Sequence, residues 1–125
     1  MNRLYITVIA AFLAFYPWGV SRAQDAGGAA FLQNLSDIPL MPGLYEVLEE
    51  GMVFDKPGGR IAEAEATADN AQPTEIKAFY MKTLPQLGWR PAGSNYFIRE
   101  SESLRIAVRD GDSGRVVHFT VLPLP

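Results

Sequence analysis

One helical segment, set between runs of alternating apolar residues, is the feature that most constrains the fold of this chain. After Pro73, apolar residues recur at spacings of three and four and form one stripe along a helix. Pro73 suits the first position of a helix, and Gly88 suits the residue just past its last turn. The stripe consists of Ile76, Phe79, Tyr80, Leu84 and Leu87. We therefore expect a single helix that lies with this stripe against a sheet.

The residues before this helix alternate with the period of a β-strand. In residues 60–66, three alanines share one face while two glutamates point the other way. Pro57 and the two glycines after it predict a tight turn, so residues 52–56 and 60–66 form a hairpin. The small alanines leave room on the inner face for a helix to pack there.

Three further strands are predicted after the helix, in residues 95–100, 104–110 and 115–122. Short polar loops separate them, which favours pairing of antiparallel neighbours. The expected fold class is α+β, with two layers. One helix packs on an antiparallel sheet of about five strands, in the order β-β-α-β-β-β.

Residues 1–23 have the layout of a secretory signal peptide. A basic start is followed by the apolar stretch Leu4–Val20, and Ser21-Arg22-Ala23 places small residues where a signal peptidase cuts. We therefore expect an exported, periplasmic protein. The alternative is a retained inner-membrane anchor with the domain outside the cytoplasm, since Leu4–Val20 is just long enough to span a bilayer.

The composition bounds the rest of the chain. Residues 24–37 are rich in small residues and predict a linker, so residues 38–125 form a single α+β domain. The chain has no cysteine, which excludes disulfides, thiol catalysis and a lipid-modified N-terminus. Its net charge of −3 disfavours binding of nucleic acid or anionic lipid. Any contact with a membrane is expected only through an uncleaved N-terminal segment.

Two motifs resemble those of a known group of proteins. Residues 79–89 have the form F-Y-x-x-x-L-P-x-L-G-W, and residues 38–44 read I-P-L-M-P-G-L. With Val53-Phe54-Asp55 before a Gly-Arg-Ile strand, the chain resembles small uncharacterised exported bacterial proteins, mostly proteobacterial. This resemblance implies a non-catalytic domain of the cell envelope and supplies no functional residues.

The segment 38–44 is also the first candidate site. Two prolines three residues apart exclude regular helix and favour an extended course. Its apolar residues either seal one edge of the core or form an exposed surface on which a partner docks. The residues of this possible docking surface are Ile38, Leu40, Met41 and Leu44.

The second candidate site is the polar face of the sheet. Its residues are Glu63, Glu65, Arg105, Arg109 and His118. Carboxylates beside a histidine can perform acid–base chemistry if they converge in a pocket. The simpler interpretation is a solvent-exposed face with cross-strand ion pairs.

No motif in the sequence predicts a cofactor or a metal ion. Asp110-Gly111-Asp112 resembles the start of a calcium loop, but Arg115 and Val121 occupy the positions of the required glycine and glutamate. We therefore expect a non-enzymatic envelope module that binds another envelope protein or acts as an accessory. The alternative is a small-ligand binder or hydrolase that uses the polar face.

Overall fold

The structure is a computed structural model and describes residues 30–125. The predicted signal peptide or anchor, residues 1–23, and the first part of the predicted linker, residues 24–29, lie outside the described residues. Strands occupy 52% of the part described, so the molecule is mostly sheet. The strands are β1 (Ala30–Phe31), β2 (Pro39–Leu40), β3 (Leu44–Glu46), β4 (Met52–Lys56), β5 (Gly59–Ala68), β6 (Arg90–Gly93), β7 (Tyr96–Arg99), β8 (Glu102–Gly111) and β9 (Gly114–Pro123). The helices are α1 (Pro73–Thr83) and the 3-10 turns η2 (Leu48–Glu50) and η3 (Leu84–Leu87).

The predicted two-layer fold with a five-stranded sheet is wrong. Seven strands form one antiparallel sheet in the order β3-β5-β9-β8-β7-β6, and β4 pairs with β5 on the same edge as β3. Strands β1 and β2 form a separate two-stranded sheet. The strands beyond the prediction are β1, β2, β3 and β6, each only two to four residues long. A run this short contains too few residues to show the alternation by which strands are recognised.

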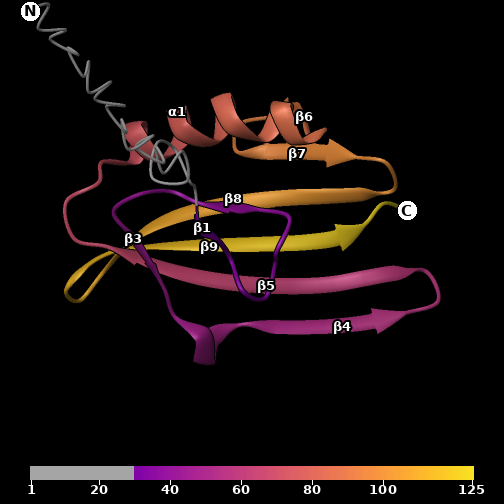
Figure 1. Ribbon diagram of the computed structural model, residues 1–125, viewed down its shortest axis with the longest axis horizontal. Helices are drawn as coiled ribbons and strands as arrows, with labels where there is room; N and C mark the ends of the chain where they lie inside the picture. Colours follow the sequence, from indigo (N-terminus) through magenta and orange to yellow (C-terminus); the bar gives the residue numbers. More distant parts are fainter. Residues whose placement is uncertain (1–29) are drawn as a thin grey trace, which may run out of the picture.

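The long elements follow the predicted periodicity. Helix α1 lies across one face of the sheet (Figure 1). On that face the alternate alanines of β5, from Ala62 to Ala68, are buried. Ile76 and Tyr80 of α1 are buried with them, and the Tyr80 ring meets Phe119 of β9 edge to face at a centroid distance of 5.4 Å. The small side chains of β5 thus allow α1 to approach the sheet closely.

Helix α1 ends as its sequence indicates. Pro85 falls in the 3-10 turn η3, and Gly88 takes the left-handed conformation with φ of 90°. The Trp89 N–H then donates a hydrogen bond to the Leu84 carbonyl at 3.1 Å, and the Trp89 side chain is fully buried. Leu87, the last residue of the predicted apolar stripe, is exposed instead, because the tighter turn rotates it away from the core.

Residues 30–44, which we call the N-terminal strap, complete the core. Leu32, Leu35 and Ile38 are fully buried, so part of the predicted linker belongs to the core. The buried Tyr80 hydroxyl donates to the Pro39 carbonyl at 2.9 Å and accepts from the Met41 N–H at 3.3 Å. Burial raises the pKa of Tyr80, and the hydrogen bond from Met41 opposes this only in part. The phenol therefore stays neutral and joins the strap to α1.

Candidate functional site

The predicted docking segment lies largely inside the molecule. Ile38 is 0% exposed and Leu44 is 4% exposed, so neither side chain offers a surface to a partner. Leu40 and Met41 are half-buried and pack against the same core. Residues 38–44 therefore occupy the position expected if they seal the core.

The polar face brings four of its five predicted residues together. His118 Nδ1 lies 3.7 Å from Glu65 and its Nε2 lies 3.9 Å from Glu63. Arg109 of β8 reaches across β9 to Glu65 of β5 at 3.6 Å. Arg105 is not part of this group, because its guanidinium lies over the Tyr96 ring at 5.1 Å.

This cluster has the geometry of cross-strand pairing on an open sheet. Glu65 and His118 are directly opposite each other in the register of β5 and β9. The two carboxylates approach opposite nitrogens of the imidazole, so they do not converge on one point. No group of three or more His, Asp or Glu side chains suited to a metal ion occurs within residues 30–125.

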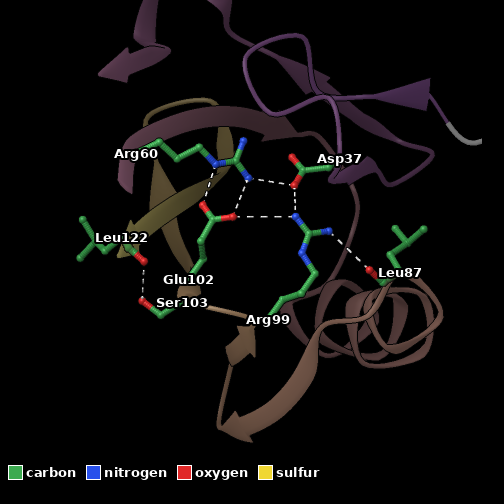
Figure 2. Close-up of polar contacts among 7 residues, drawn as sticks. All are labelled: Asp37, Arg60, Leu87, Arg99, Glu102, Ser103 and Leu122. Atoms are coloured by element: carbon green, nitrogen blue, oxygen red, sulfur yellow. Dashed lines mark hydrogen bonds and ion pairs between the residues drawn. The ribbon is translucent and has the colours of Figure 1, made fainter. Parts of the chain in front are cut away.

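A second ionic cluster, which the sequence did not predict, joins the strap to the sheet (Figure 2). Asp37 Oδ2 accepts hydrogen bonds from Arg60 at 2.8 Å and from Arg99. Arg60 also donates to Glu102, with Nε 2.7 Å from Oε2. Arg99 in turn lies over the Trp89 ring at 4.3 Å from its centroid. We call Asp37, Arg60, Arg99 and Glu102 the strap clasp.

The strap clasp joins parts of the chain that are far apart in sequence. Asp37 is 23 residues from Arg60 and 62 residues from Arg99. Burial alone would raise the pKa of Asp37, but the hydrogen bonds from the two arginines outweigh burial and hold that pKa below its usual value. Burial likewise opposes the charge of Arg60, yet its hydrogen bonds to Glu102 and Asp37 raise the pKa of Arg60. All the charges have partners, so the cluster serves to hold the strap on the domain.

The turn that resembles a calcium loop borders a small hollow. It is lined by Thr67, Asp69 and residues 111–116. Its volume of about 100 Å³ is well below the roughly 300–1,000 Å³ of typical small-molecule sites. The hollow therefore offers no site for a substrate of ordinary size.

Strand β4 carries the most unusual surface of the described chain. Met52, Val53 and Phe54 are 48%, 48% and 58% exposed, although they are consecutive apolar residues of a strand. Within residues 30–125, five of the nine exposed large apolar residues lie in the short stretch from Tyr45 to Phe54. Because side chains alternate along a strand, Met52 and Phe54 lie on one face and Val53 on the other, and both faces of this edge expose apolar side chains.

The register extends this surface onto the outward face of the sheet. Phe54 lies directly opposite Ile61 of β5. Ala62 of β5 pairs with Val121 of β9 in an antiparallel register, so the adjacent residues Ile61 and Leu122 also lie opposite each other. Both side chains point outward, because those of Ala62 and Val121 point into the core. Leu122 is itself exposed. We call the outward-facing residues Met52, Phe54, Ile61 and Leu122, together with Val53 on the opposite face of the same strand, the β4 edge surface.

The two edges of the sheet differ in a way that bears on function. Within residues 30–125, β4 pairs only with β5 and is the outermost strand on its side (Figure 1). The opposite edge strand, β6, contains Pro91 and Gly93, and its register shifts between these residues. Proline, glycine and bulges are devices that prevent a strand edge from pairing. The edge at β4 lacks them.

Sequence reasoning placed β4 correctly as a strand but did not mark it as a binding surface. The run Met52-Val53-Phe54 reads like any buried strand, and only its position at the edge exposes it. Both faces of this strand are apolar, and a strand without alternation is predicted to be buried on both faces, so the sequence carried no local signal for the exposed edge.

Comparison with models of known protein families, with curated proteins and with solved structures found no match. Within residues 30–125, no helix is long and apolar enough to span a membrane.

Proposed function

We propose that this protein is a non-catalytic module of the cell envelope that binds another protein chain through the β4 edge surface. The single observation that carries this proposal is the exposure of three consecutive apolar residues on an unpaired strand edge. Proteins bind extended chains at such edges by adding a strand, with backbone hydrogen bonds for affinity and alternate side chains for specificity.

Two further observations support the proposal. The ionisable clusters are arranged in ion pairs on an open face and at the strap, which is the geometry of structural ion pairs. The N-terminal signal sequence predicts export, which would bring the module to other envelope proteins. The module would work where it is delivered, either free in the periplasm or held by a retained anchor.

The test is site-specific crosslinking in the native envelope. A photo-crosslinking amino acid at position 54 should form covalent products with a defined protein chain, whereas the same group at position 81 should not. Met81 is a suitable control because it is also an exposed apolar residue but lies on α1. The substitution Val53→Lys should reduce the products at position 54 at least tenfold, since a charge on the strand opposes pairing. Equal products at positions 54 and 81, or products unaffected by Val53→Lys, would refute the proposal.

A further inference from the structure

The geometry of β4 points to a second copy of this chain as the protein that pairs with it. We infer a two-fold symmetric dimer in which β4 of each copy lies antiparallel to β4 of the other. This inference rests on the proposed function, because it names the occupant of the same surface.

The length and composition of β4 suit pairing with itself. The strand spans five residues, with Phe54 in the middle. If Phe54 is placed opposite Phe54 of the second copy, Val53 faces Asp55 and Met52 faces Lys56, so all five residues are paired. If the register between the two β4 strands shifted by one residue, core-facing residues of one copy would lie opposite outward-facing residues of the other. Directly paired residues in an antiparallel sheet point to the same face, so the symmetric dimer excludes this register.

The charges also permit this arrangement. The chain as a whole is acidic, with a net charge of −3, but β4 carries one acid, Asp55, and one base, Lys56. In the register centred on Phe54, no like charges are opposed. A register centred on Asp55 would oppose two carboxylates, which is unfavourable. The Phe54 register instead places two aromatic rings in contact at the two-fold axis.

The size of the contact sets its strength. The contact between two five-residue strands buries less surface than a standard protein interface, which buries about 1,200–2,000 Å². We therefore expect a reversible dimer whose population rises with protein concentration. The two sheets would join into one continuous sheet, in which the two copies of Phe54 meet at the axis and Ile61 and Leu122 extend the apolar row outward on each side.

The first experiment uses the absence of cysteine from the chain. In the predicted register Phe54→Cys places two thiols opposite each other, with Cα atoms about 4.5–5.5 Å apart, a separation that a disulfide spans. Oxidation of Phe54→Cys should therefore give a covalent dimer. Leu87→Cys, an exposed position at the end of η3, is the matched control and should remain monomeric.

The second experiment tests the register by charge. Phe54→Lys opposes two ammonium groups at the axis, and Phe54→Glu opposes two carboxylates. Each variant alone should dimerise at least tenfold more weakly than the unaltered protein in sedimentation analysis. An equal mixture of the two should recover dimer, because opposite charges then face each other.

The outcomes separate this inference from the proposed function. An unaltered protein that stays monomeric at high concentration, with equal crosslinking of Phe54→Cys and Leu87→Cys, overturns the dimer. If position 54 still crosslinks to a different envelope protein in that case, the proposed function stands and only its occupant changes. Single variants that dimerise as well as the unaltered protein, or an equal mixture that stays as weakly dimeric as the single variants, also overturn the inference.

Discussion

Asp37 is the residue on which the attachment of the strap depends most. Its carboxylate accepts hydrogen bonds from two arginines that come from β5 and β7. The ionic groups of this cluster are about a fifth to a quarter exposed, so solvent weakens each pair but does not remove it. The strap would lose its main polar contact if this carboxylate were neutral.

The substitution Asp37→Asn tests this role. We expect the free energy of unfolding to fall by about 1–2 kcal/mol, because two charge-assisted hydrogen bonds are lost or weakened. Urea denaturation followed by tryptophan fluorescence measures the change, since Trp89 lies beside Arg99. Asp112→Asn, in the exposed turn between β8 and β9, is the matched control and should leave stability within about 0.5 kcal/mol. Equal stability of the two variants would contradict the role of Asp37.

The same carboxylate makes a prediction about pH. The pKa of Asp37 is lowered in the folded protein, so its contribution is complete above the unfolded value near 3.8. This contribution is lost as the pH falls below that value and through the folded pKa. The stability difference between the unaltered protein and Asp37→Asn should therefore be constant near neutral pH and shrink below about pH 4. A difference that stays constant down to pH 2.5 would show that the Asp37 carboxylate is not responsible.

At the scale of elements, tight turns hold the long strands in register. Gly114 begins β9 with φ of 143°, a conformation that favours glycine. A Cβ atom there would lie 2.6 Å from the Ala68 carbonyl oxygen, which belongs to the backbone of β5. The close approach of β9 to the end of β5 thus requires the absence of a side chain.

Gly114→Ala should destabilise the domain by about 2–3 kcal/mol, because both the backbone conformation and the contact with Ala68 are unfavourable. Thermal unfolding measured by circular dichroism would show the loss as a lower midpoint. Gly58→Ala is the control, since no atom lies within 4 Å of its Cβ position and its φ is not positive. A midpoint for Gly114→Ala equal to that of Gly58→Ala would disprove the steric argument.

Five of the six elements that the sequence predicts have a clear local period, and the sixth, β4, was predicted from the tight turn that follows it. Helix α1 follows the spacing of Ile76 and Tyr80, and the alternate alanines of β5 mark its buried face. The period arises from backbone geometry within one segment, so it can be read without knowing the neighbours. The boundaries of β5, β8 and β9 extend one or two residues beyond those predicted. The short strands carry no such period, which is why the sheet is larger than expected.

The candidate sites show the same division between local and long-range information. The pairing of Glu65 with His118 could be anticipated, since both residues lie out of phase with buried neighbours on long strands. The strap clasp could not, because its members become neighbours only after three separate segments, the strap, β5 and the β7–β8 hairpin, fold together. The burial of Ile38 likewise depends on where the strap packs, and the exposure of Phe54 depends on the position of β4 at the edge of the sheet.

At the scale of the whole molecule, the predicted fate of residues 1–23 would decide where the proposed binding through the β4 edge surface takes place. If the predicted signal peptide is cut after Ala23, the protein recovered from its native envelope begins at Gln24. If the segment is a retained anchor, the protein begins at Met1 and is extracted only with detergent. Intact mass spectrometry of the native protein distinguishes the two starts. A start at any other residue would contradict both interpretations.

The sequence by itself determined the single helix, the hairpin before it and the three strands after it. These depend on the spacing of apolar residues within about 15 positions, and that spacing follows the geometry of helix or strand directly. Only the tertiary structure decided that residues 38–44 seal the core, that Asp37 is held by two arginines and that β4 is an open edge. Each of these depends on contacts between distant segments, and an apolar residue reads the same in a sequence whether its neighbours cover it or leave it exposed.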